Sequence, residues 1–135
     1  MNLRPLLTLT IAPLFLLGCD YYDGRLKIVN KTPQVLAAEV CPDTLPRSSC
    51  FNHPAFYQQA RIRPDSTYSP LMPEANGWEK AIFRSQNNQL NLFVFRLDSL
   101  DKYQSIDTLI ARKMYRRLSR SKQQLINDNW RITIQ

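Results

Sequence analysis

The sequence predicts a mainly β domain, a small β-sandwich of about six short strands with two short helices before the C-terminal strand. Three observations support this class. Segments in which apolar and polar residues alternate recur along the chain, and this is the period of a half-buried strand. Turn-forming residues separate these segments. Sustained helical periodicity is confined to the region between residues 105 and 127.

The first two predicted strands lie at residues 25–30 and 34–40. In the first, basic and apolar residues alternate. Residues 30–33, Asn-Lys-Thr-Pro, have the composition of a turn. We therefore expect the two segments to pair as a hairpin.

A long loop is predicted at residues 41–59, which contain three prolines and no clear periodicity. Alternation resumes at residues 60–63. A short strand follows at 67–69, and Pro70 limits it to an edge or an early stop. Residues 78–83 can form a single helical turn.

The strongest strand signal is the segment at residues 90–96, Leu-Asn-Leu-Phe-Val-Phe-Arg. Apolar side chains on both faces are expected of a central strand that is covered on both sides. Beyond it, Ser105 can cap a helix that runs to Met114, and Ser119 can cap a second helix. Residues 130–134 close the chain as a strand. A sandwich of immunoglobulin-like or transthyretin-like type accommodates this order of elements.

The N-terminal residues have the pattern of a secretory signal. Arg4 supplies the positive charge, and residues 5–17 are almost wholly apolar or Thr. This run is too short for a membrane span, which needs about 20 apolar residues. The alternative, a buried N-terminal helix, is disfavoured by Pro5 and Pro13.

The run ends in Leu16-Leu17-Gly18-Cys19, which resembles the lipobox of bacterial lipoproteins. The resemblance implies that diacylglycerol is attached to the Cys19 thiol and that a peptidase cuts before this residue. The predicted organisation is then a cleaved signal peptide (1–18), a lipidated Cys with a short tether (19–24) and a single β-rich domain (25–135). Two or more acyl chains make such an anchor stable.

Export fits the remaining cysteines, Cys41 and Cys50, which form an even pair in an oxidising compartment. We expect a disulfide between them. The alternative is metal binding, because Cys50 and His53 have Cys-x-x-His spacing. Zinc needs three or four ligands, and His53 is the single histidine of the chain, so we expect neither a metal nor another cofactor.

The chain is basic, with a formal net charge of +7. Export argues against a nucleic-acid partner, so an anionic membrane or acidic polymer remains the alternative to a purely solubilising charge. The basic residues concentrate in an acid-free run: Arg112, Lys113, Arg116, Arg117, Arg120 and Lys122. We expect a solvated helix–helix junction there, with contact to anionic lipid head groups as the alternative.

Catalytic motifs are absent from the sequence. No Gly-x-Ser-x-Gly turn exposes a nucleophile, and three dispersed glycines cannot form a phosphate loop. Asp98 and Asp101 fit a turn and helix start better than a pair of catalytic acids. We therefore expect a non-enzymatic protein. A ligand-binding lipoprotein and an enzyme with an unrecognised site are the alternatives.

The C-terminal half carries a second resemblance. Asp98 and residues 100–103 (Leu-Asp-Lys-Tyr), a Leu118-Ser119 helix start and a final Trp130-Arg131-Ile132 strand follow one order. This order resembles a family of small uncharacterised lipoproteins of Bacteroidota. The resemblance implies a location at the cell envelope, on the outer or inner membrane, but no reaction. The expected partners are the membrane, through the lipid on Cys19, and an envelope protein or glycan.

Overall fold

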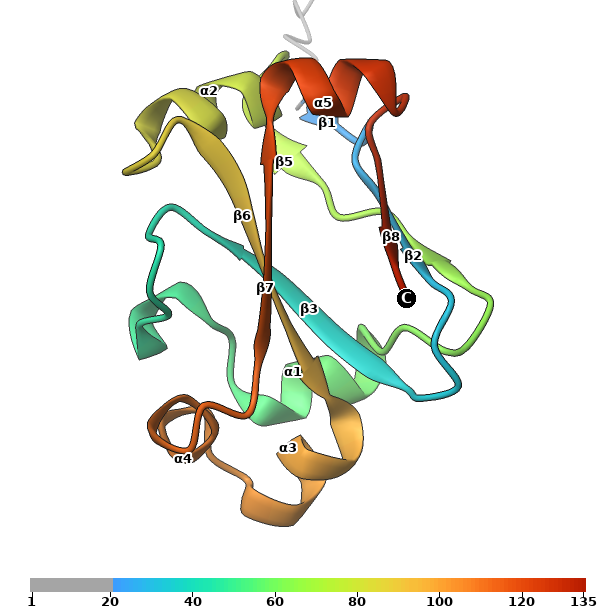
Figure 1. Cartoon of the computed structure of the whole chain (residues 1–135), viewed down its shortest axis with the longest axis vertical. Coiled ribbons are helices and arrows are strands. Elements are labelled where there is room, and N and C mark those ends of the chain that lie inside the picture. The colour runs from blue at the N-terminus through green and yellow to red at the C-terminus, as the bar shows by residue number, and fades with distance from the viewer. Residues whose placement is uncertain (1–20) are drawn as a thin grey trace, which may run out of the picture.

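A computed structural model describes residues 21–135 (Figure 1). Its strands fall into three sheets, and helices lie at both ends of the long axis. The strands are β1 (Tyr22–Asp23), β2 (Lys27–Asn30), β3 (Leu36–Cys41), β4 (Thr67–Tyr68), β5 (Met72–Pro73), β6 (Gln89–Arg96), β7 (Arg116–Ser121) and β8 (Arg131–Ile134). The helices are η1 (Ser48–Cys50), α1 (Pro54–Gln59), α2 (Gly77–Arg84), α3 (Leu97–Tyr103), α4 (Ile106–Ala111) and α5 (Lys122–Asn127).

Two three-stranded sheets enclose the main core. One has the order β4-β2-β8 and the other β3-β6-β7, while β1 and β5 form a separate short ribbon. Alternate residues of each strand point to the same face, so one face of each sheet is apolar. The resulting core contains, among others, Leu26, Ile28, Leu36, Leu92, Val94, Leu118, Ile132 and Ile134. A single bridge between Leu36 and Ile62 joins the edge of β3 to the chain ahead of β4.

Helices cover the other face of the β3-β6-β7 sheet. Phe93 and Phe95 of β6 pack there against Tyr57 of α1, Leu100 of α3 and Leu109 of α4, and all five residues are buried. This second core explains why β6 is apolar on both faces. The prediction of a central, doubly covered strand at residues 90–96 is confirmed.

The mainly β class is confirmed only in part. The described residues are 31% helical and 30% strand, so the domain is a small mixed α/β domain. The structure has eight strands where about six were expected, and it adds the helices α1 and α3, which cover a sheet face. These helices are short, and their apolar residues are too few to establish a helical period.

The expected hairpin between residues 25–30 and 34–40 is wrong, although both strands exist. Strand β2 pairs antiparallel with β4 and parallel with β8, whereas β3 pairs antiparallel with β6. Asn30 makes the separation possible. Its buried amide donates to the carbonyls of Gln34 (2.7 Å) and Ile62 (3.0 Å), so the chain crosses from one sheet to the other instead of folding back.

Both expected helices exist, with two changes of boundary, and the first of them, α4, ends at Ala111 and not at Met114. Ser105 caps α4, because its Oγ accepts the Thr108 N–H at 3.2 Å. Ser119 does not cap a helix: it lies within β7, and Ser121 begins α5 with a capping box to Gln124. Leu125 is buried as expected, but Ile126 is exposed. The two expected helices are therefore separated by a strand.

The folded domain begins earlier than residue 25. Tyr22 and Asp23 pair with β5, and Asp23 is buried beneath the start of α2. The segment expected as a tether, 19–24, thus contributes a strand to the fold. Among residues 21–135, no helix has the length and apolar character needed to cross a bilayer.

Candidate functional site

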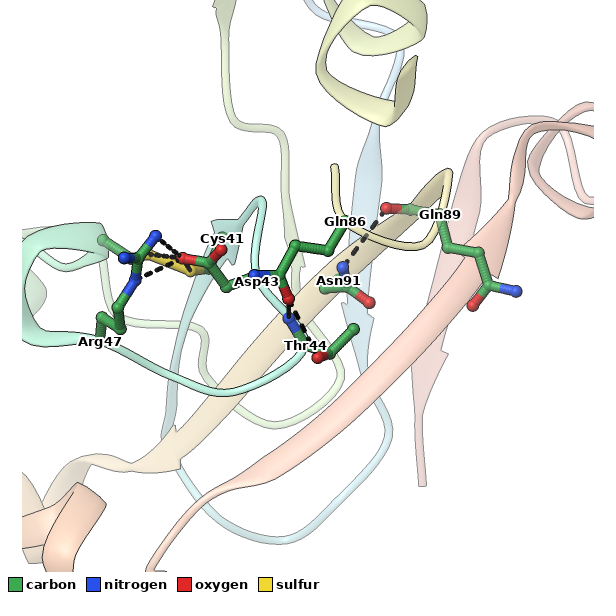
Figure 2. Close-up of a disulfide and its surroundings, with 8 residues drawn as sticks. Cys41, Asp43, Thr44, Arg47, Gln86, Gln89 and Asn91 are labelled. Atoms are coloured by element: carbon green, nitrogen blue, oxygen red, sulfur yellow. Dashed lines mark hydrogen bonds and ion pairs between the residues drawn. A yellow bond between two sulfur atoms is a disulfide. The ribbon is translucent and has the colours of Figure 1, made fainter. Parts of the chain in front are cut away.

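The structure places the sequence-predicted site residues in separate parts of the molecule. Cys19 lies outside the described residues. The two remaining cysteines are brought together, with an S–S distance of 2.07 Å and a Cα–Cα distance of 5.4 Å. The predicted Cys41–Cys50 disulfide is therefore present in the structure, where it joins the end of β3 to η1 (Figure 2).

Asp43 lies against this disulfide. Its Oδ2 is 3.9 Å from both sulfur atoms and accepts a hydrogen bond from Arg47 Nε at 2.6 Å (Figure 2). The side chains of Cys41, Asp43 and Cys50 have the spacing of metal ligands. In the disulfide form, however, neither sulfur is a thiolate, and the one carboxylate is already paired with Arg47. The cluster therefore acts as a clamp on the loop.

The rest of the loop is tied to neighbouring segments. Gln86 Oε1 accepts hydrogen bonds from the backbone N–H and the hydroxyl of Thr44, each at 3.2 Å (Figure 2). The Thr44 carbonyl in turn accepts a hydrogen bond from Arg117 of β7. Thr44 thus ties the proline-rich loop both to the turn ahead of β6 and to β7.

His53 has a structural role at the start of α1. Its Nδ1 accepts the Ala55 N–H at 3.3 Å, which is the contact of a helix N-cap. Asp98 and Asp101 do not converge on a shared point. Asp98 pairs with Arg96, whose guanidinium holds the pKa of that carboxyl below its ordinary value, and Asp101 accepts from Gln58.

Glu39 is the acid that sequence reasoning missed. Burial raises the pKa of its carboxyl, although two hydrogen bonds to its charged form oppose that rise. The donors are Asn52 Nδ2 at 2.7 Å and the Tyr57 hydroxyl at 3.2 Å. Burial also raises the pKa of Tyr57. Because both donors come from the 41–59 region, Glu39 serves to hold that region on β3.

The basic run does not form a helix–helix junction, and that expectation is wrong. It begins after α4, continues through β7 and ends at the first residue of α5, so it extends along the long axis of the molecule (Figure 1). Strand alternation divides it between two faces. Arg116 and Arg120 share the face of the buried Leu118, which points into the core between the sheets, and Arg117 lies on the opposite face.

Arg116 and Arg120 line an open side between the two three-stranded sheets, which we call the β7–β8 seam. The seam is the space between the free edges of β7 and β8, which end the orders of their respective sheets. A cavity of about 450 Å³ lies at one end and includes Lys113, Arg116 and Gln135. A second cavity, of about 490 Å³, includes Arg120, Arg131 and Thr133, and also reaches Gln135.

The seam is positively charged. Lys113, Arg116 and Arg120 come from the basic run, and Arg131 comes from β8. Arg96 also lines the first cavity, but its charge is paired with Asp98. Asp128 is the one acid among the residues lining these two cavities. Arg116 reaches across and donates to the Gln135 carbonyl at 2.6 Å. Sequence reasoning found three of these cations but could not find Arg96 or Arg131, since only the fold brings them together.

No family model, curated protein or solved structure matches the chain. The fold and the site therefore define its class by themselves. It is a small mixed α/β domain with one disulfide-clamped loop and one cationic seam between two sheet edges.

Proposed function

We propose that this protein is a lipid-anchored, non-enzymatic protein of the cell envelope that serves as a structural or partner-binding module. The observation that carries the proposal is the Leu16-Leu17-Gly18-Cys19 sequence, three residues ahead of the first strand at Tyr22. Membership of the Bacteroidota lipoprotein family, and attachment to the outer or the inner membrane, are parts of the same proposal.

The short distance from Cys19 to the fold supports a fixed orientation. An extended chain spans at most about 3.6 Å per residue, so three residues place β1 within roughly 11 Å of the lipid attachment point. Strand β1 lies at the same end of the molecule as α2 and α5 (Figure 1). This end, which we call the β1–α2–α5 end, would face the bilayer.

Exposed apolar side chains at this end support the same orientation. Tyr21 (66% exposed), Leu71 (62%) and Phe83 (81%) lie beside or on β1, β5 and α2. The Tyr21 ring, with one polar and one apolar part, favours the head-group region of a bilayer, and Leu and Phe side chains like Leu71 and Phe83 insert at its apolar boundary. The β1–α2–α5 end therefore presents side chains suited to that region on the side from which the lipid would extend.

Cys19→Ala tests the anchor directly. We expect the variant to remain an uncut precursor that takes up no fatty-acid probe during metabolic labelling, because the thiol that carries the lipid is gone. The matched control is the double variant Cys41→Ala/Cys50→Ala, which removes the other two thiols and should label like the wild type. Probe incorporation into Cys19→Ala would refute lipidation at this residue.

A tryptophan placed at Phe83 tests the orientation. In the full-length protein reconstituted into vesicles, Phe83→Trp should be quenched by lipids that carry a quencher near the head groups. Phe56→Trp is the control, because Phe56 is also exposed (42%) but lies on α1 at the opposite end (Figure 1). The native Trp78 and Trp130 are buried and give a constant background. Equal quenching of the two variants would contradict the orientation.

A ligand-binding lipoprotein is the second candidate function. The observation that favours it is the 450 Å³ cavity, which combines cationic Lys113 and Arg116 with apolar Leu36, Val94 and Ile134. Such a mixture of apolar walls and a few polar groups is typical of binding sites.

A further inference from the structure

The β8 edge offers unpaired backbone groups to the seam. Lys27 and Lys31 donate their N–H groups to the carbonyls of Trp130 and Ile134, both at 2.8 Å, so these carbonyls face β2. Backbone groups of successive residues in a parallel strand point to opposite sides. The N–H and carbonyl of Thr133 consequently point away from β2, toward the seam, where the described chain supplies no further strand.

The side chains around this edge are cationic. Arg131 lies on β8 itself, and Arg116 and Arg120 reach the seam from β7. None of the three takes part in an ion pair within the described residues. Arginine at a sheet edge is also a common protection against edge-to-edge aggregation. Here, however, the arginines lie on two different sheets and face a shared space with two cavities.

We propose that the seam binds an extended, acidic segment of a partner protein, which adds as a strand to the free edge of β8. The main chain of the segment would bond to Thr133 and its neighbours, as in other cases of strand addition. Its carboxylates would pair with Arg116, Arg120 and Arg131 through charge-assisted hydrogen bonds. The proposal rests on the partner-binding part of the proposed function. Strand addition itself does not need lipidation, whereas the preference for a peptide over a lipid surface also rests on the anchored orientation.

The geometry favours a peptide over a lipid surface. The seam is parallel to the long axis and lies on the side of the molecule, whereas a flat bilayer would meet the β1–α2–α5 end (Figure 1). A strand rises about 3.3 Å per residue, so the four residues of β8 accommodate a partner segment of comparable length. An anchored domain would therefore keep the seam open to neighbouring proteins.

The experiment measures binding of a fluorescent seven-residue probe, an alternating Thr/Glu peptide, to the full-length protein in detergent. Fluorescence anisotropy gives the affinity at low and high salt. Three further probes define the mode of binding: the same peptide with Lys in place of Glu, the Thr/Glu peptide with N-methylated backbone amides, and anionic vesicles. The N-methylated peptide keeps its charge but cannot pair as a strand.

Two pairs of protein variants complete the design. Arg116→Glu/Arg120→Glu reverses two seam charges, and its control, Arg61→Glu/Arg63→Glu, makes the same change at two exposed arginines outside the seam. Thr133→Pro removes one edge N–H without a change of charge, at an edge position where proline is tolerated. Thr133→Ala is its control.

We expect the Thr/Glu peptide to bind, with affinity at least about tenfold weaker for Arg116→Glu/Arg120→Glu, for Thr133→Pro and for the N-methylated probe. The two control variants should bind like the wild type. Absence of peptide binding would overturn the proposal, and so would equal binding of the N-methylated probe, which indicates general attraction between charges. If Arg116→Glu/Arg120→Glu lost binding to anionic vesicles but kept binding to the Thr/Glu peptide, the proposal would be overturned in favour of a lipid surface. None of these results depends on whether Cys19 is labelled.

Discussion

Replacement of Asp23 by Asn is expected to lower the free energy of unfolding by about 1.5–3 kcal/mol, the range for hydrogen bonds to a charged group. The Asp23 carboxylate accepts hydrogen bonds from the Arg25 side chain at 2.7 and 2.8 Å and from the Trp78 N–H at 3.3 Å. It thereby holds β1 against the start of α2. The change is measured by urea unfolding with tryptophan fluorescence.

Asp65→Asn is the matched control, because Asp65 forms an exposed ion pair with Lys31. An exposed pair of this kind contributes less than about 1 kcal/mol. The Asn side chain also suits the positive φ of 55° at that position. If Asp23→Asn and Asp65→Asn lowered stability equally, the Asp23 contacts would not stabilise the fold.

The same carboxylate predicts a pH dependence. The hydrogen bond from Arg25 lowers the pKa of Asp23 below its ordinary value of 3.8; burial opposes this shift, and the Trp78 N–H reinforces it. The unfolded chain then binds the proton more readily than the folded one. The stabilisation from Asp23 is therefore complete well above pH 3.8 and is lost as the pH falls through 3.8 toward the folded-state pKa. The stability difference between wild type and Asp23→Asn should shrink over this interval.

Removal of the disulfide by Cys41→Ala/Cys50→Ala is expected to lower the free energy of unfolding by about 2.5–3 kcal/mol. The physical reason is the greater conformational freedom of the unfolded chain once the ten-residue loop is open. The bond also holds Phe51 beside Phe93 and Phe95, at ring-centroid distances of 5.8 and 5.2 Å. For a domain of this size the melting temperature should fall by about 10 °C.

Wild-type protein in a reducing agent provides the control for the disulfide. It should melt at the temperature of the double variant if the missing bond, and not the lost sulfur atoms, causes the change. The Phe51→Leu variant separates the aromatic contacts from the cross-link, because its melting temperature should still fall on reduction. Identical melting of oxidised and reduced wild type would contradict the prediction.

Parts of the fold and of the candidate site could be found only with the tertiary structure. The α2 helix shows why: its N-cap residue, Asn76, makes no capping hydrogen bond, and the Trp78 N–H is satisfied by Asp23, which is 55 residues away. No local pattern indicates such a cap. The seam is similar, since Arg116 and Arg131 come together only because β7 and β8 end two different sheets.

The sequence by itself determined the features that depend on neighbouring residues. The apolar run of β6, the Ser105 cap, the strand at the C-terminus and the Cys41–Cys50 pair all follow from short-range periodicity, side-chain chemistry or loop composition. Strand pairing was decided only by the tertiary structure. Strands β2 and β3 have the pattern of a hairpin, but they lie in two different sheets, whose apolar faces pack on one shared core. Strand β2 pairs with β8, about 100 residues later, and β3 pairs with β6. Alternation of apolar residues specifies which face of a strand is buried, and it does not specify which strand lies beside it.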